Sequence, residues 1–318
     1  MVAVLDVHRL RLLRELQRCG TLAAVARALS YSPSAISQQL AQLEAETGVQ
    51  LLERVGRGVR LTGQARILVA HTEAILERLE AAEAELAASL TEVAGTLRVA
   101  SFQSVLLALV PAALSRLSGR HPRLRVEITH READDAFAGL LAREFDVVLG
   151  EGYQGLPLPP TAGAQTEELA RDEIRLALPV HGPYAGLAPG PAAGPADPTA
   201  PADLAALAEV PWILDPDDTA PGQWARTLCR SAGFEPDVRF ESPDLLLQVH
   251  LVETGHAAAL LPDLLFTDRQ ARIRLCHLPG RPWRRLYTAV RTGAAEHPSV
   301  RAFRSALQYG LRTVTDER

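Results

Sequence analysis

The sequence predicts a multidomain α+β protein. Its N-terminal module is all-α, a winged helix-turn-helix, and it is followed by a long linker helix and a larger α/β domain. Two short helical patterns joined by a polar turn lie near the N-terminus, and a coiled-coil-like pattern follows them. Beyond this, β-rich runs alternate with helical patterns. We place the boundaries of the four segments at residues 1–63, 64–90, 91–96 and 97–318.

The segment from Thr21 to Glu44 predicts the helix-turn-helix, because apolar residues recur at helical spacing on both sides of a polar turn. Thr21 suits the N-cap of the first helix, and Ser32-Pro33 starts the second helix with a capping hydroxyl and a proline at the first position. Hydroxyls and amides on the outer face can bond to base edges in the major groove. The candidate DNA-binding residues are Thr21, Ser32, Ser34, Ser37, Gln38, Gln39 and Gln42.

An arginine-rich hairpin is predicted after the second helix. Gly48 fits a helix C-cap, and residues 48–62 contain a short apolar run, a glycine-rich turn and a strand pattern. Such a hairpin is a wing beside the duplex. Its arginines, Arg54, Arg57 and Arg60, would meet phosphates or the narrow minor groove.

Positive charge is concentrated in this N-terminal part. Residues 1–66 contain nine arginines and five acidic residues, a balance of +4, whereas the remainder carries 24 arginines and 33 acidic residues, a balance of −9. A basic module on an acidic body is typical of a protein that touches nucleic acid with one part only. The chain has no lysine, which excludes Schiff-base and Ser-Lys mechanisms.

These motifs together resemble the LysR-type transcriptional regulators of bacteria. The resemblance rests on Gly20-Thr21, Ala35-Ile36-Ser37, Leu43-Glu44, Gly48-Val49, Leu51-Leu52-Glu53-Arg54, Gly56-Arg57 and Leu61-Thr62. Two departures stand out. Pro33-Ser34 replaces the family's usual Gln-Pro, so one base-reading amide is absent, and Thr62-Gly63-Gln64-Ala65 replaces Thr-Pro-Ala-Gly before the next helix.

A long helix is predicted from Gln64 to Leu90. Its apolar residues average about 3.5 residues apart, as in a coiled-coil seam. The seam consists of Leu68, Thr72, Ile75, Leu79, Ala82 and Leu86. Flanking glutamates leave little other apolar face, so a dimerisation helix is favoured over a helix packed on its own domain. The resemblance implies the same linker helix and a homodimer or homotetramer.

Residues 97–318 predict an α/β domain of two lobes with parallel-rich sheets. The strand-like runs are Leu97–Ala100, Leu124–Thr129, Val147–Leu149, Ile174–Leu178, Trp212–Leu214, Val238–Phe240, Ala257–Leu261 and Leu286–Val290. The resemblance implies an effector domain similar to periplasmic binding proteins. Its first lobe would hold residues 97–168 and 270–318 and its second residues 169–269, with crossings near Glu167–Asp172 and Pro262–Arg272. Residues 182–201, nearly all Gly, Pro and Ala, predict a surface loop.

A small-molecule site is expected between the lobes, where strand ends form a crevice. The candidate effector-binding residues are Ser101, Gln103, Ser104, Thr129, His130, Arg131, Glu151, Asp215 and Ser242. Hydroxyls and amides at helix N-termini, with cationic His130-Arg131 beside them, suit a small anion or carboxylate. Alternatively, the serines and threonines are ordinary helix caps.

The sequence shows no catalytic motif and no short Cys/His spacing that suits zinc. Cys19, Cys229 and Cys276 are widely separated, which predicts reduced cytosolic thiols. The resemblance implies a cytoplasmic regulator that binds double-stranded DNA at an interrupted palindrome, takes a small-molecule co-inducer but no cofactor or metal, and has RNA polymerase as a further candidate partner and no membrane contact. Two alternatives stay open: a small-molecule binding protein with a helical association module, and an α/β enzyme with a helical appendage.

Overall fold

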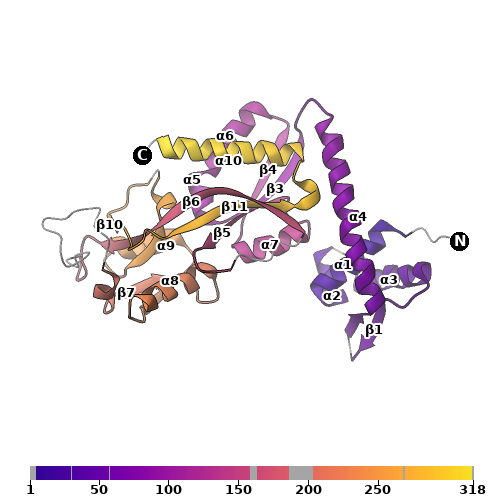
Figure 1. Ribbon diagram of the computed structural model, residues 1–318, viewed down its shortest axis with the longest axis horizontal. Helices are drawn as coiled ribbons and strands as arrows, with labels where there is room; N and C mark the ends of the chain where they lie inside the picture. The colour runs from indigo at the N-terminus through magenta and orange to yellow at the C-terminus, as the bar shows by residue number, and fades with distance from the viewer. Residues whose placement is uncertain are drawn as a thin grey trace. The chain divides into compact units, whose positions relative to one another are not determined.

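The computed structural model describes residues 5–29, 31–56, 58–157, 163–185, 203–267 and 269–316. The chain forms two compact units (Figure 1). The first contains residues 1–89 with 292–297, and the second contains residues 90–291 with 298–318. None of the helices in the described ranges is both long and apolar enough to cross a membrane.

In its described residues, the first unit contains four α-helices and a hairpin, with a short 3-10 turn added from near the C-terminus. The helices and the hairpin strands are α1 (Val7–Cys19), α2 (Leu22–Ala28), α3 (Pro33–Thr47), β1 (Leu52–Val55), β2 (Gly58–Leu61) and α4 (Gly63–Ala88). The predicted elements did not include α1, although its leucines recur at helical spacing, and α1 supplies much of the core. Leu10, Leu13 and Leu16 of α1 pack with Ile36 and Leu40 of α3, and all five are buried.

The helix ends follow from capping chemistry. Thr21, Ser32 and Thr62 each accept a hydrogen bond from the backbone N–H three residues later, as N-caps do. Gly20 and Gly48 end α1 and α3 in the left-handed conformation, with φ of 73° and 68°. The predicted start of the reading helix at Ser32-Pro33 is therefore confirmed, and Thr62 fixes the start of α4 despite the departure from the family's motif.

Helix α4 has two apolar faces, whereas the sequence analysis recognised only one. Val69, Thr72 and Leu76 are buried on one face, and Val69 belongs to the core around α1. On the predicted seam, Leu79 and Leu86 are 44% and 70% exposed. The expectation that flanking glutamates leave little other apolar face was wrong, because Val69, Leu76 and Ala84 form a second apolar side that is buried. Of the predicted seam, Thr72 is buried and Leu68 packs partly against the core, whereas Ile75, Leu79, Ala82 and Leu86 stay exposed.

The first lobe of the second unit is built on one sheet with the strand order β4-β3-β5-β11-β6. These strands are β3 (Gly95–Ser101), β4 (Leu124–His130), β5 (Val147–Tyr153), β6 (Ala164–Pro179) and β11 (Trp283–Arg291). Strand β3 is parallel to β4 and β5, but β11 is antiparallel to both β5 and β6. The sheet is therefore mixed rather than parallel-rich, because β11 returns from the second lobe against the direction of its neighbours.

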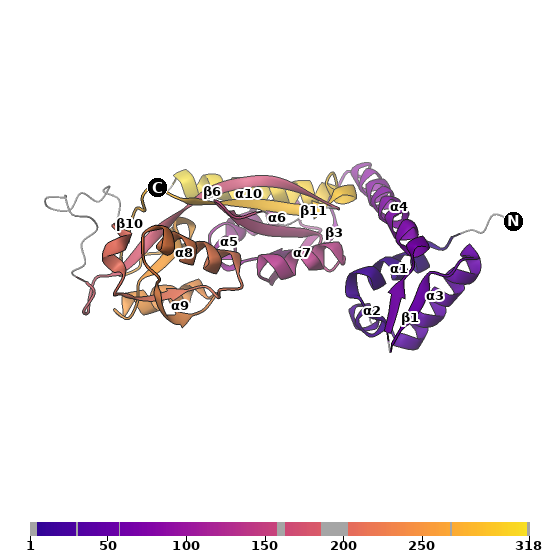
Figure 2. The same cartoon turned by 60° about the horizontal axis from the view of Figure 1, so that its bottom comes forward.

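Helices cover both faces of this sheet. They are α5 (Gln103–Ala108), α6 (Val110–Arg120), α7 (Ala133–Leu141) and α10 (Pro298–Asp316). Helices α6 and α10 pack together, whereas α7 packs on β5 and β11. Figures 1 and 2 both place α7 on the opposite side of the sheet from α10.

The second lobe combines the end of β6 with strands β9 (Ala259–Pro262) and β10 (Ile273–Cys276), and with the parallel pair β7 (Pro211–Leu214) and β8 (Asp237–Glu241). Around them lie α8 (Ala220–Ser231), α9 (Leu245–Glu253) and the 3-10 turns η1 (Leu204–Leu207) and η2 (Asp263–Phe266), while η3 (Thr292–Ala294) belongs to the first unit. Fully buried Trp212 lies in the core of the lobe. Each predicted strand is present, whereas β10 was not predicted; an arginine interrupts its short apolar run, Ile273-Arg274-Leu275-Cys276.

Strand β6 carries the chain from one lobe to the other. It pairs with β11 up to Glu173 and with β9 from Ile174 onward, just beyond the predicted crossing at Glu167–Asp172. Because β10 still pairs with β6, the return lies between Cys276 and Trp283 rather than at Pro262–Arg272. The second lobe thus extends past its predicted end at residue 269. Of the predicted loop at 182–201, residues 186–201 lie outside the described ranges.

Candidate functional site

Helix α3 presents a polar face that is free of the core. Ser34, Ser37, Gln38 and Gln42 are exposed, while Ile36, Leu40 and Leu43 on the opposite side are fully buried. The buried face fixes the helix to the rest of the N-terminal module of residues 1–63, which we call the head. The exposed face offers hydroxyl donors and amide donor–acceptor pairs. These are groups that can read base edges in the major groove.

Four of the predicted reading residues already have intramolecular partners. The hydroxyls of Thr21 and Ser32 cap helices, and the Ser32 hydroxyl also lies 3.0 Å from that of Ser34. Gln39 Oε1 accepts a hydrogen bond from Arg9 Nε at 3.0 Å. The two amides of α3 that keep both ends available are therefore Gln38 and Gln42.

The wing is fastened to the reading helix by a carboxylate. Glu44 Oε1 accepts hydrogen bonds from the backbone N–H groups of Leu51 and Leu52, at 2.7 and 2.9 Å. In the wing, Arg60 bonds to Glu53 at 2.8 Å, whereas Arg54 is exposed with no ion pair to any described residue. Arg57, predicted to contact DNA, lies outside the described residues.

A cavity lies between the two lobes of the second unit, with about 560 Å³ of empty space, part of it open to solvent. Its walls come from both lobes: Phe102, Gln103, Glu132, Glu151, Tyr153, Ile174, Leu214, Asp215, Pro221, Trp224, Ala225, Pro243, Leu245, Leu260, Pro262 and Arg284. Apolar and aromatic side chains around a few polar groups are typical of a small-molecule site.

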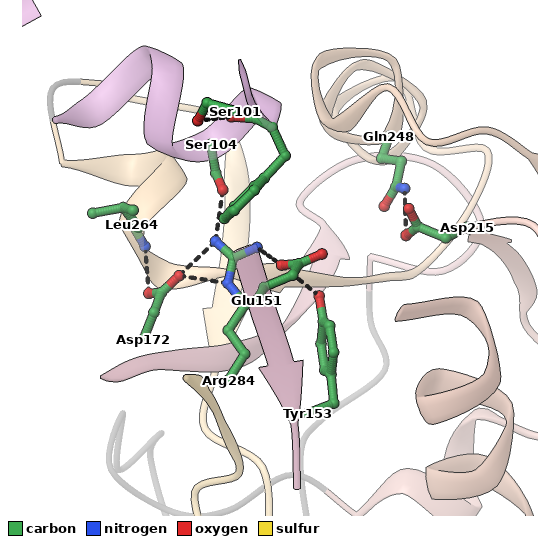
Figure 3. Close-up of polar contacts among 10 residues, drawn as sticks. Ser101, Ser104, Glu151, Tyr153, Asp172, Asp215, Gln248, Leu264 and Arg284 are labelled. Atoms are coloured by element: carbon green, nitrogen blue, oxygen red, sulfur yellow. Dashed lines mark hydrogen bonds and ion pairs between the residues drawn. The ribbon is translucent and has the colours of Figure 1, made fainter. Parts of the chain in front are cut away.

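Arg284 of β11 is the centre of a buried ion-pair network (Figure 3). Its guanidinium donates to Glu151 at 2.6 Å, to Asp172 at 2.7 and 3.0 Å, and to Ser104 at 2.6 Å. The second oxygen of Asp172 accepts from the Leu264 N–H at 2.8 Å. Burial disfavours the charge of Arg284, but attraction to Asp172 and Glu151 outweighs burial and raises the pKa of Arg284 above its usual value. The network joins β5, β6, β11, α5 and η2.

Asp215, at the end of β7, lies apart from this network (Figure 3). One carboxylate oxygen accepts a hydrogen bond from Gln248 at 3.1 Å. Burial raises the pKa of Asp215 to about 7; the Gln248 bond opposes this shift, and the charges of Glu151 and Glu132 add to it. Burial and the charge of Glu151 likewise raise the pKa of Glu132. The cavity is therefore acidic.

The predicted effector residues divide into three groups. Gln103, Glu151 and Asp215 line the cavity. Ser101 and Ser104 are buried, and Ser104 bonds to Arg284 rather than facing the space. Thr129, His130, Arg131 and Ser242 are absent from the lining, and the Ser242 hydroxyl accepts from the Asp244 N–H as in an ordinary local turn.

Sequence reasoning missed the most connected cavity residue, Arg284, and the aromatic residues Tyr153 and Trp224. Little in the sequence marks Arg284, because it stands next to Arg285 and before the predicted strand Leu286–Val290. The aromatic residues carry no distinguishing signal either, since a tyrosine or tryptophan near a strand or helix is usually core.

The thiols have restricted chemistry. Burial raises the pKa of Cys229 to about 12 and also raises that of Cys276. Cys19 is partly buried, and all three cysteines are free. Within the part of the chain that the structure describes, no cluster of three His, Cys, Asp or Glu side chains is placed to hold a metal ion.

A winged helix-turn-helix in one unit and a two-lobed domain with a cavity in the other define a class of DNA-binding regulator. The sequence matches the bacterial regulatory helix-turn-helix protein, lysR family, over residues 7–66, and the LysR substrate binding domain over residues 90–312. The chain belongs to the LysR family and is a LysR-type transcriptional regulator.

Relatives and solved structures agree with this assignment. A probable hydrogen peroxide-inducible genes activator of Mycobacterium avium is 29% identical, over 87% of this chain and 85% of that protein. The transcriptional regulator MetR of Escherichia coli is 27% identical, over 94% and 89%. A full-length variant of OxyR from Pseudomonas aeruginosa shares the fold with a TM-score of 0.65 at 19% identity, over 96% and 95% of the chains.

The Arg284 network yields a stability prediction. Arg284→Met should lower the free energy of unfolding by about 3–5 kcal/mol, because it leaves Glu151 and Asp172 buried without their cation. Arg285→Met is the matched control, since the Arg285 side chain is 39% exposed and lies 3.9 Å from Glu168; its cost should stay below about 1 kcal/mol. Equal losses in urea unfolding would contradict the role given to Arg284.

The acidic cavity predicts a pH-dependent effect of Asp215→Asn. The folded pKa of about 7 lies above the ordinary value of 3.8, so the folded state binds the proton more tightly and the wild type loses stability as pH rises between these values. Asparagine carries no charge. We compare the free energy of unfolding of the variant with that of the wild type in urea. The difference should favour the variant by on the order of 1–3 kcal/mol more at pH 8 than at pH 5. A gain independent of pH would show that Asp215 is not a costly buried carboxylate.

Proposed function

We propose that this regulator reads double-stranded DNA with Ser34, Ser37, Gln38 and Gln42 of α3, and that Arg54 of the wing contacts the backbone or minor groove. The observation that supports this most is the exposed polar face of a helix whose other face is fully buried. Three other predicted residues have structural roles within the protein: Gln39 bonds to Arg9, and Thr21 and Ser32 cap helices. We assign them a secondary part in binding.

We further infer that α4 dimerises through its exposed seam. Ile75, Leu79 and Leu86 line a surface on which apolar area lies open to solvent, and pairing two such helices would bury it. Two linked heads would read an interrupted palindrome, with the spacing of the half-sites adding selectivity. A homodimer is the smallest assembly that does this, and a homotetramer would join two of them.

The cavity between the lobes is proposed as the effector site of a cytoplasmic regulator. A ligand that binds both walls would favour one arrangement of the lobes, and the oligomer would transmit the difference to the paired heads. RNA polymerase contact at the promoter would follow from the position of the bound heads. A catalytic role is disfavoured, because the relatives are named as a transcriptional regulator and as a genes activator.

Oxidant sensing is a less favoured alternative. It is suggested by the relatives named as hydrogen peroxide-inducible genes activators. A peroxide-reactive cysteine needs an accessible thiolate. Burial of Cys229 and Cys276, with raised pKa values, works against such a role for these two thiols.

The DNA-reading assignment predicts two different defects. With an operator fragment located by footprinting upstream of the chain's own gene, wild-type affinity should fall steeply with salt, because phosphate contacts release counterions. Arg54→Ala should weaken binding to all sequences and reduce the salt slope, whereas Gln38→Ala should alter base preference at a cost of about 1–3 kcal/mol. Fluorescence anisotropy titrations on operator and scrambled duplexes measure both. If both variants bind as wild type does, the reading residues are misassigned.

The dimerisation proposal predicts that Leu79→Glu dissociates the oligomer. A charge in the seam removes an apolar contact and brings in a carboxylate that the pair would bury. Val180→Glu is the matched control, because Val180 is 41% exposed, close to the 44% of Leu79, but lies in the second unit. Sedimentation velocity should show a lighter species for Leu79→Glu only. An unchanged oligomer for Leu79→Glu would place the interface elsewhere.

A further inference from the structure

We propose that the cavity between the lobes binds a small organic ammonium ion, with the charged nitrogen against Asp215 and the hydrocarbon part against Trp224 and Tyr153. This inference rests on the proposed function, in which the cavity is the effector site. It replaces the anion expected from the sequence with a ligand of opposite charge.

The charges of the cavity wall do not balance. Glu132, Glu151 and Asp215 line the space, and Arg284 is the one basic residue among the described lining residues. Arg284 is shared between Glu151 and Asp172, and Asp172 is itself buried. A buried carboxylate normally has a cation or several hydrogen bonds to offset its desolvation. Here the wall lacks at least one positive charge.

Asp215 is the carboxylate left without a cation. Among the described residues, its side-chain partner is the Gln248 amide, which bonds to a single oxygen. Arg226 approaches, but it donates to the backbone carbonyl of Asp215 at 2.8 Å and pairs its other nitrogen with Glu241. Glu132, by contrast, has a side chain that is 46% exposed to solvent, and its Oε1 lies 3.6 Å from His130 Nε2. A ligand cation would therefore find its strongest unmet partner at Asp215.

An anionic ligand would meet no available cation in the same space. The Arg284 side chain is 3% exposed and makes four hydrogen bonds to Glu151, Asp172 and Ser104. His130 and Arg131, the cations expected from the sequence, do not line the cavity. A bound carboxylate would also face Glu132, Glu151 and Asp215, and like charges at close range disfavour binding.

The remaining wall suits the hydrocarbon part of an ammonium ion. The rings of Tyr153 and Trp224 lie 5.5 Å apart, and both line the cavity beside Ile174 and Leu260. Aromatic faces attract cations, most strongly where water is excluded. An aromatic wall and a carboxylate in the same cavity therefore favour a cation with attached carbon over a bare metal ion, for which the wall offers few oxygen ligands.

Binding would displace a proton from Asp215. The groups that face this carboxylate are Glu132, Glu151, Arg284 and Tyr153, with Gln248 as its hydrogen-bond donor and Arg226 at its backbone. With a pKa of about 7, Asp215 is mostly neutral at pH 6 and mostly ionised at pH 8. An alkylammonium ion stays charged over this range. Its affinity should therefore rise with pH.

The test is isothermal titration calorimetry of the full chain with butylamine, 1-butanol and butyrate, which share a carbon skeleton and differ in charge. We expect saturable binding of butylamine alone, about tenfold tighter at pH 8 than at pH 6. Asp215→Asn should abolish binding. Asp218→Asn should leave it unchanged, because this exposed residue makes the same charge change in the neighbouring loop without lining the cavity.

Several results would overturn the proposal: preference for butyrate, equal binding of all three compounds, no saturable butylamine binding, or wild-type binding by Asp215→Asn. Operator binding by the same preparation separates this outcome from failure of the proposed function. Salt-dependent operator binding without butylamine binding rejects only the ligand class. Butylamine binding without any operator binding supports the ligand class and rejects the DNA-reading role.

Discussion

The ion-pair network of Arg284 is the constraint on which the ligand-binding unit depends. Arg284 is 2% exposed. Its guanidinium connects β11, which returns from the second lobe, to β6, which enters that lobe. Such a network is expensive to desolvate and stable only when complete. Because Arg284 is committed to Glu151 and Asp172, it organises the cavity without neutralising Asp215. The electrostatic character of the cavity follows from this commitment.

A similar division of labour governs the DNA-reading head. The polar residues of α3 and its surroundings look equivalent in sequence, yet several make hydrogen bonds within the protein. Ser32 caps the helix and Gln39 bonds to Arg9. The Glu44 carboxylate accepts hydrogen bonds from the backbone of the wing. Under the proposed function, few groups remain for base contact, and the amide that Pro33-Ser34 replaces is absent as well. Selectivity would then depend strongly on pairing two heads.

Local signals were enough to predict much of the fold. Caps at Thr21 and Ser32, the hairpin at the wing and the eight strand runs depend on nearby residues, so the sequence alone locates them. Long-range pairing is different. The direction of β11, the short strand β10 and the second buried face of α4 depend on partners distant in the chain. The same limit applies to the cavity: Arg284 and Glu151 are 133 residues apart, and nothing in the sequence near either residue indicates the other.

The most direct test of the whole account is a footprint of the full-length protein on its operator, with and without butylamine at pH 8. The account predicts that butylamine changes the extent or spacing of the protected half-sites for the wild type and leaves the footprint of Asp215→Asn unchanged. A wild-type footprint that stays the same while butylamine is bound would contradict the claim that the cavity controls how the paired heads read DNA.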